Sequence, residues 1–275
     1  MVAFAREERL VRVRPAAVAG FFYPADPHEL RRAVQSCLAE GRGRAADATD
    51  DRPKALVAPH AGYVYSGPVA GTAFARLEPC ADAIRRVVLI GPSHRVAFRG
   101  LALSSASAFA TPLGLVPLDV EGSARLATIP QVGVLDAAHA EEHSLEVELP
   151  FLLEILRDWV LLPICAGAAS AAEVAAALEA VWGGEETLVL VSSDLSHDLD
   201  YEAARRRDAA TTAAIEALRP EGLDAESACG RVPLRGLLVA ARAHGLAVRT
   251  LDVRSSGDTT GPRDRVVGYG AYAFA

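Results

Sequence analysis

Lysine is almost absent from this chain: Lys54 is the single lysine among 28 basic residues, and the others are arginine. A Walker A phosphate loop and a Schiff-base enzyme both need a lysine amine, so lysine-dependent chemistry is excluded everywhere except at Lys54. We also find no GxGxxG after an expected strand, no HExxH and no GxSxG. These absences argue against dinucleotide-binding enzymes, zincin proteases and serine hydrolases of the nucleophile-elbow type.

Cysteine is sparse and widely spaced, with Cys37, Cys80, Cys165 and Cys229 forming no CxxC pair. This spacing excludes a zinc knuckle and a dense disulfide framework, and it favours reduced thiols. Cys229 stands apart from the others because Gly230, Arg231 and Pro233 place it just before an expected helix and beside a guanidinium. Both features lower a thiol pKa, so we expect a reactive Cys229, whereas the other three read as packing residues.

A basic face, a long apolar run and a secretory leader are also missing. The net charge of −7 argues against a nucleic-acid partner, because phosphate binding needs positive charge. No apolar run approaches the length that spans a membrane, and the first residues (MVAFAREERLVRVRP) have no hydrophobic segment of the secretory kind. We therefore expect a cytoplasmic protein with no membrane partner.

Three short β-branched apolar runs are present, and each ends in a turn of small residues that carries a histidine. They are ALVAPHAGY with His60, VVLIGPSH with His94 and TLVLVSSDLSH with His197. In an open α/β sheet the ligand crevice lies outside the carboxyl ends of the strands, so three such histidines would converge on one site. The pattern predicts a metal or proton-transfer centre, with Asp194, Ser192 or Ser193 orienting the turn or the ring of His197.

Strand and helix patterns alternate along the whole sequence, which predicts one α/β domain over residues 1–275 with helices on both faces of a mostly parallel or mixed sheet. A polar loop is expected at 41–53, and a hairpin or edge addition at 100–120. The expected helices are 28–40, 67–77, 142–157, 171–182, 201–218 and 233–244, and the expected strands are 55–58, 87–90, 160–165, 187–191, 248–253 and 266–274.

The segment before the leucine-rich helix carries His139 and His143 beside Glu141 and Glu142. Its spacing is not that of a zinc protease, because the glutamate base of HExxH is missing. Capping of the helix N-terminus and lining of the cleft both remain open for this segment.

Seven strings now resemble one family, in order and over nearly the whole chain: PAAVAGFFYP from Pro15, APHAGYVYSG from Ala58, GPSH from Gly91, EHSLEVELPFL from Glu142, SSDLSH from Ser192, ACGRVP from Ala228 and VVGYGAYAF from Val266. The chain resembles the Memo family, also called AmmeMemoRadiSam system protein B, which is named in animals for receptor-driven cell motility. The resemblance implies a three-layer α/β/α fold similar to class III extradiol dioxygenases of the LigB type. It also implies that His60, His94 and Cys229 are metal ligands, with His197 in the place of the dioxygenase proton-transfer histidine and Asp194 beside it.

One departure from the dioxygenases affects the chemistry, because they hold iron(II) with two histidines and a carboxylate, whereas Cys229 would supply a thiolate. A thiolate is softer and oxidisable, which makes iron(II) and copper both suitable ions and puts ring cleavage in doubt. From their places in the motifs we expect Phe21, Tyr63 and Tyr65 to wall the pocket, with His143 as a further pocket residue. Asp194 is expected to orient His197.

Three interpretations stay open, and we favour the first: a redox-metal oxidoreductase in which His197 moves the proton. The second is a non-catalytic scaffold that binds a peptide, a metal ion or a small molecule and acts with the radical-SAM and AMMECR1-like proteins that the system name implies. The third is a thiol hydrolase with Cys229 as nucleophile, His197 as base and Asp194 as orienting group.

Overall fold

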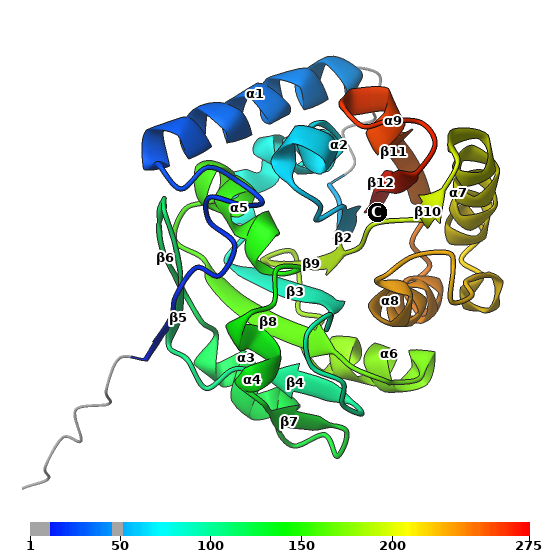
Figure 1. The fold of residues 1–275 in the computed structure, drawn as a ribbon. Coiled ribbons are helices and arrows are strands. Elements are labelled where there is room, and N and C mark those ends of the chain that lie inside the picture. Colours follow the sequence, from blue (N-terminus) through cyan, green and yellow to red (C-terminus); the bar gives the residue numbers. More distant parts are fainter. Residues whose placement is uncertain (1–11, 46–51) are drawn as a thin grey trace, which may run out of the picture.

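A computed structural model describes residues 12–45 and 52–275 of the chain (Figure 1). They form a mixed α/β fold built on a nine-stranded sheet in the order β10-β12-β2-β9-β3-β8-β4-β7, with β11 paired to β12. The sheet strands are β2 (Ala55–Ala58), β3 (Arg86–Pro92), β4 (Leu101–Leu103), β7 (Val132–Val134), β8 (Val160–Ala166), β9 (Thr187–Ser192), β10 (His197–Leu199), β11 (Val248–Ser255) and β12 (Val266–Phe274).

The centre of the sheet is parallel, since β2, β9, β3 and β8 all run in the same direction. Outside this centre β12 is antiparallel to β2, β10 and β11, and β4 is antiparallel to β8, whereas the edge strand β7 is parallel to β4. The mixed sheet predicted from the sequence is therefore confirmed. Because β2, β9 and β3 are neighbours in the same direction, their carboxyl ends lie side by side at one edge of the sheet.

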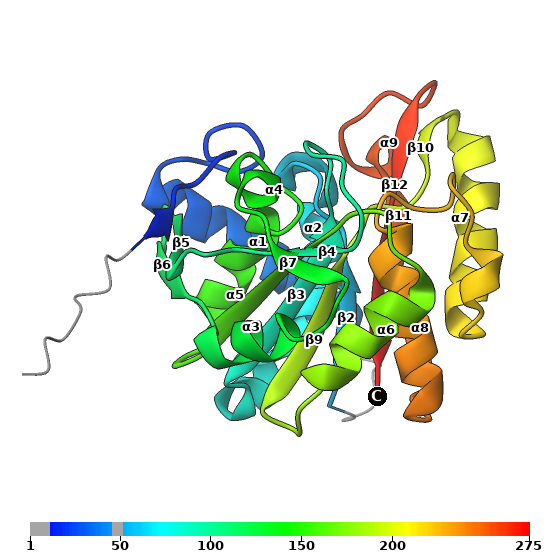
Figure 2. The same cartoon turned by 90° about the horizontal axis from the view of Figure 1, so that it is seen from below.

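Helices cover both faces of this sheet, as Figures 1 and 2 show. One face packs against α1 (Pro27–Ala45), α2 (Tyr63–Ala75) and α5 (Leu149–Ile155), and the other against α6 (Ala171–Ala180), α7 (Tyr201–Glu216) and α8 (Arg231–Ala243). Each central strand contributes side chains to the cores on both faces of the sheet. Leu56 packs in the core on the side of α1, α2 and α5, and its neighbour Val57 packs in the core on the side of α6, α7 and α8. This two-sided burial explains why the central strands read as continuous apolar runs. Shorter helices are α3 (Val120–Leu126), α4 (Ala137–Ala140), α9 (Ser256–Thr259), η1 (Glu78–Ala83), η2 (Glu146–Glu148) and η3 (Pro220–Gly222).

Small residues let α1 and α2 touch backbone to backbone. A Cβ atom at Gly71 would lie 2.2 Å from the carbonyl oxygen of Cys37, and one at Gly41 would lie 2.3 Å from the oxygen of Gly71. Part of the polar loop expected at 41–53 is therefore helical, because α1 continues to Ala45 and needs Gly41 for this approach. Residues 46–51 of that expected loop lie outside the described part of the chain.

The hairpin expected at 100–120 is confirmed, with β5 (Ala108–Thr111) and β6 (Gly114–Pro117) antiparallel and β1 (Val13–Arg14) added alongside β5. Within residues 12–45 and 52–275, no helix is both long and apolar enough to cross a membrane.

The prediction of a helix from Glu142 to Arg157 is wrong at both ends. Helix α5 covers only Leu149–Ile155, and it follows the single 3-10 turn of η2. Pro150 has no backbone N–H and therefore fits only in the first turn of a helix, where α5 places it. The preceding residues stay irregular and turn their side chains toward several different neighbours.

Glu146 ties the N-terminal segment to this irregular stretch. Its carboxylate is completely buried and pairs with Arg14, which is also buried. It accepts further hydrogen bonds from the backbone N–H groups of Ala17 and Val18 and from the hydroxyl of Tyr23. Four donors on one carboxylate satisfy its lone pairs, which is the condition for burying an ion pair at acceptable cost.

We predict that Glu146→Gln lowers the free energy of unfolding by about 3 kcal/mol, because the Arg14 guanidinium would stay buried without its counter-ion. Urea denaturation measures the loss. The matched control is Glu78→Gln, which breaks the exposed Arg42–Glu78 pair and should cost under about 1 kcal/mol. Equal losses in the two variants would contradict the anchoring role of Glu146.

Candidate metal centre

The strand ends bring His60 and His94 to one point, and the loop before α8 brings Cys229 to the same point. One ligand atom from each of the three residues lies within 4.8 Å of the others. Within this group, Cys229 Sγ and His60 Nε2 lie 3.3 Å apart. The convergence predicted from the strand-turn-histidine pattern is thus seen for these two histidines.

This donor set fits a metal ion. Bonds of about 2.3 Å to a thiolate and about 2.1 Å to an imidazole place the two donor atoms about 3.6 Å apart at a tetrahedral angle. The 3.3 Å between Sγ and Nε2 is close to that spacing. Two imidazoles and one thiolate suit iron, copper or zinc better than calcium or magnesium, which prefer oxygen ligands.

His60 is held at both its backbone and its ring. Its N–H donates to Asp194 Oδ1 over 2.8 Å, and its Nδ1 lies 2.6 Å from the hydroxyl oxygen of Ser192. The residue is 1% exposed. Burial, with the nearby rings of His143 and His94, lowers the pKa of His60 well below its ordinary value, so its imidazole is neutral and able to bind a metal ion at neutral pH.

His94 is oriented by a carboxylate instead. Glu142 accepts the His94 backbone N–H at 2.5 Å, and the other carboxylate oxygen lies 2.9 Å from His94 Nδ1. Burial alone would raise the pKa of Glu142, but hydrogen bonds from the His94 ring and the Ser144 N–H lower it to about 2. A carboxylate bound to the far nitrogen of a ligating histidine fixes its tautomer and increases its basicity.

His143 lines the same site, as the sequence allowed. Its ring stacks on that of His94, with centroids 4.6 Å apart, and meets the ring of Phe22 at a tilt of 42°, also with centroids 4.6 Å apart. Burial lowers the pKa of His143 to about 4. The motif predicted that Phe21 of this aromatic turn would wall the pocket, but it is Phe22 that contacts His143.

The three residues predicted to wall the pocket lie in different surroundings in the structure. The Phe21 side chain is 88% exposed, and Tyr65 is 40% exposed. Tyr63 lies in the core, where it packs on Phe151 and donates its hydroxyl proton to the Val147 carbonyl. Tyr63 is buried and Tyr65 is partly exposed because residues two apart in a helix, here α2, lie on different sides of it.

His197 reaches the site from the start of β10. Its Nδ1 lies 2.9 Å from the carbonyl oxygen of Leu195, so the carbonyl, rather than Asp194, orients the ring. Asp194 accepts from the backbone of His60 instead, although its carboxylate, His197 and Cys229 offer ligand atoms within 4.8 Å of one another. Burial raises the pKa of Asp194 to about 6.

Cys229 is not the activated thiol that its position before a helix suggested. Burial and the neighbouring carboxylate of Asp194 raise its pKa, and this opposes the effect expected from the helix N-terminus and Arg231. A metal ion would still bind the thiolate form by displacing the proton.

A hollow of about 560 Å³ leads to these side chains. Those that line it include His94, Leu195, His197 and Cys229. A reactant entering it would meet His197 and two of the candidate ligands, His94 and Cys229. His139, by contrast, lies in the core, with its ring 3.0 Å from the Ala102 carbonyl oxygen.

Known proteins resemble this chain over nearly its full length. The model of the family described as Memo-like protein matches residues 14–273. A MEMO1 family protein of Aquifex aeolicus is 35% identical over 94% of this chain and 98% of its own length, and one of Methanopyrus kandleri is 36% identical over 95% and 98%. The chain belongs to the Memo family.

Among solved structures, an uncharacterized protein of Escherichia coli K12 has a similar fold, with a TM-score of 0.54 over 80% of this chain and 98% of its own. Its identity is 13%, so the likeness supports the fold alone. Five of the Memo-family strings in this chain contribute side chains to the centre described above: APHAGYVYSG, GPSH, EHSLEVELPFL, SSDLSH and ACGRVP.

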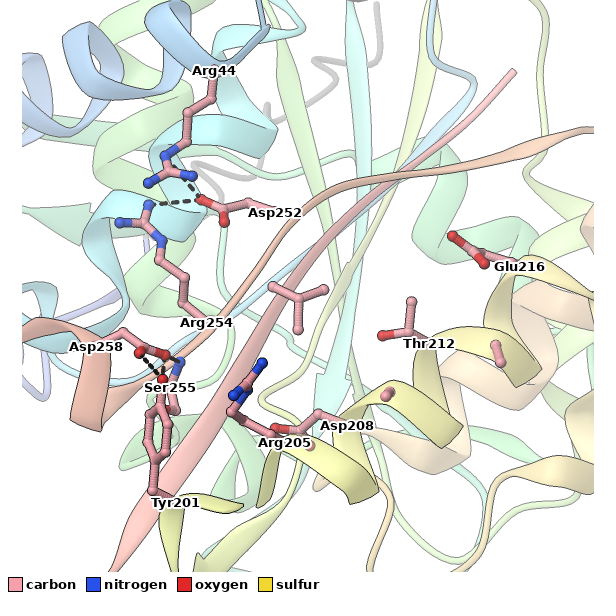
Figure 3. A pocket seen from close by; sticks show the side chains of 13 residues that line it. Arg44, Tyr201, Arg205, Asp208, Thr212, Glu216, Asp252, Arg254, Ser255 and Asp258 are labelled. Carbon is pink, nitrogen blue, oxygen red and sulfur yellow. Dashed lines mark hydrogen bonds and ion pairs between the residues drawn. The ribbon is translucent and has the colours of Figure 1, made fainter. Parts of the chain in front are cut away.

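A second hollow of about 790 Å³ lies between α7 and β11 (Figure 3). Two of its arginines, Arg44 and Arg254, both flank Asp252. Asp208 links this hollow to the candidate metal centre, because it accepts the backbone N–H of Ser196 over 3.0 Å and so supports the SSDLSH turn from behind. None of the candidate ligands in the described residues lines this hollow.

The buried His139 gives a prediction for the pH dependence of stability. Burial lowers its pKa from 6.5 to about 4, so between these values the unfolded chain binds a proton that the folded chain does not. Stability therefore falls as the pH drops through this window, by about 3 kcal/mol for this group. We expect His139→Gln, whose amide can still donate to the Ala102 carbonyl, to flatten the curve of unfolding free energy against pH over this window. Parallel curves for the two proteins would contradict the assignment.

Proposed function

We propose that this Memo-family protein is a metal-dependent oxidoreductase that holds iron(II) or copper with His60, His94 and Cys229. The observation that carries the proposal is the placement of Cys229 Sγ beside His60 Nε2, with His94 in the same cluster and His197 on the wall of the hollow that leads to it. A redox ion held there would supply one-electron chemistry and polarise a bound oxygen atom.

The protein's own groups support a proton transfer at this point. A carbonyl oxygen only accepts, so the contact with Leu195 requires the proton of His197 to sit on Nδ1. The lone pair of His197 Nε2 is then free to take a proton from a reactant in the hollow. His197 is thus the proposed general base, and Asp194 acts through the backbone of His60.

The substrate in this proposal is a small molecule that enters the 560 Å³ hollow. A cytoplasmic location fits an oxidisable thiolate ligand, since reducing conditions preserve it.

A scaffold function is the second candidate, and one observation favours it. Phe21, Val64 and Tyr65 expose apolar surface on two segments that are joined by a hydrogen bond from the Tyr63 N–H to the Phe22 carbonyl. Exposed apolar side chains grouped in this way are typical of a surface that binds a peptide or protein. The radical-SAM and AMMECR1-like proteins belong to this second proposal as partners.

The first test is metal content after anaerobic purification with iron or copper supplied. We expect near-stoichiometric metal in the wild type and loss of most of it in Cys229→Ala, because one of three ligands is removed. Cys80→Ala is the matched control, since this half-buried thiol lies outside the candidate cluster. Absence of specific metal from the wild type would overturn the oxidoreductase and favour the scaffold.

His197→Gln separates proton transfer from metal binding. We expect this variant to retain the metal at the level of the wild type, because His197 is not one of the three proposed ligands. Oxygen-dependent turnover, once a substrate is found by screening, should fall by about 100-fold or more with loss of the general base. Loss of the metal in His197→Gln would instead make this residue a ligand.

A further inference from the structure

Two glutamates in the turn η2 are both completely buried but have very different surroundings. Glu146 has the Arg14 guanidinium and three other donors, as described above. Among the described residues Glu148 makes one hydrogen-bond contact, with the hydroxyl of Ser192 at 2.9 Å, and its Oε2 atom has no hydrogen-bond partner. A buried anion needs a cation or several donors, so Glu148 does not have the surroundings of a carboxylate.

The hydroxyl oxygen of Ser192 is the centre of a small network. It lies 2.6 Å from His60 Nδ1, 2.6 Å from the carbonyl oxygen of Ser144 and 2.9 Å from Glu148 Oε1. A serine hydroxyl has one proton to donate and two lone pairs that accept. Three neighbours therefore require one acceptor and two donors.

The carbonyl oxygen of Ser144 has no proton, so it must be the acceptor of the Ser192 proton; otherwise two oxygen atoms would meet at 2.6 Å with no hydrogen between them. The other two neighbours must then donate. His60 carries its proton on Nδ1, and Glu148 carries a proton on Oε1. The unpartnered Oε2 is then a neutral carbonyl oxygen, and buried carbonyl oxygens are left without a partner more often than N–H groups are.

We infer that Glu148 is a neutral carboxylic acid that acts through Ser192 as a positioning residue for His60, holding the imidazole in the Nδ1–H tautomer that leaves Nε2 free for a metal ion. The inference about tautomer and proton stands on the geometry alone, whereas the benefit to metal binding rests on the proposed function.

The physical effect is the exclusion of the wrong tautomer. If Glu148 did not donate, the Ser192 hydroxyl could turn its proton toward His60 Nδ1, and the proton of the ring would move to Nε2, next to Cys229. That tautomer has no lone pair on Nε2, the nitrogen beside Cys229, for a metal ion. With Glu148 donating and the Ser144 carbonyl accepting, Ser192 can only accept from His60. His94 reaches the same result through the charged Glu142, so the two ligands are supported by different chemistry.

Burial agrees with this assignment. It raises the pKa of Glu148 well above its ordinary value, and the negative charge of Asp194 adds to the effect. A neutral acid at this position also avoids placing another negative charge beside a site that would hold a thiolate.

Infrared spectroscopy of the metal-free protein tests the proton on Glu148. At neutral pH we expect the carbonyl-stretch band of a protonated, buried carboxyl group in the wild type and its loss in Glu148→Gln. Nitrogen NMR of the His60 ring should show Nδ1 protonated in both proteins, because the glutamine amide can also donate to Ser192. Absence of the band from the wild type, or a proton on Nε2, would overturn the inference.

Cobalt(II) titration tests the consequence for metal binding, because its absorption reports thiolate ligation directly. We expect Glu148→Gln to bind cobalt with a Kd within about threefold of the wild type, and Glu148→Leu and Ser192→Ala to bind about 10–100-fold more weakly. The double variant that combines Glu148→Leu with Ser192→Ala should bind cobalt no more weakly than Ser192→Ala alone, since both substitutions act through one hydroxyl.

Several cobalt results would contradict the positioning role: wild-type affinity in Glu148→Leu, equal weakening in Glu148→Gln and Glu148→Leu, or additive losses in the double variant. Thermal unfolding of each variant shows that the change is not a loss of fold. If the wild type binds no cobalt at all, the proposed function fails, while the infrared and NMR results still decide the protonation of Glu148.

Discussion

The shared direction of β2, β9 and β3 is the constraint on which the rest of the molecule depends. Their pairing places three carboxyl ends at one edge of the sheet, and the turns that follow carry His60, His94 and the SSDLSH segment. Because parallel strands are buried on both faces, their register is strongly specified by packing. The positions of the candidate ligands are therefore consequences of core packing by residues such as Leu56 and Val57.

An irregular segment, residues 142–148, adds the polar support. Its three buried glutamates have three different tasks: Glu142 orients His94, Glu146 anchors the N-terminal segment through Arg14, and Glu148 reaches His60 through Ser192. A regular helix would place residues four apart on one face and could not send these side chains to three separate neighbours. The delayed start of α5 is thus part of how the site is built.

The two histidines of the cluster differ in their hydrogen-bond partners, and this difference has chemical meaning. A carboxylate on His94 makes that imidazole the stronger electron donor, whereas a neutral hydroxyl on His60 leaves it a weaker one. Together with a thiolate, such a set would favour a soft or borderline ion and would limit the total negative charge of a buried site. A free nucleophile needs a lowered pKa, whereas a metal ligand can lose its proton when the metal ion binds. The raised pKa of Cys229 therefore fits a ligand better than a nucleophile.

The sequence by itself determined the α/β class, the main strands, the convergence of His60 and His94, and, through the resemblance, the grouping with Cys229. These features follow from local periodicity and from strand direction, which residues close together in the sequence determine. The tertiary structure alone decided that Phe22 rather than Phe21 meets His143, that Leu195 rather than Asp194 orients His197, and that the Cys229 pKa is raised. It also decided the role of Glu148, because a hydrogen bond between residues 44 apart in the chain depends on packing that no local pattern encodes.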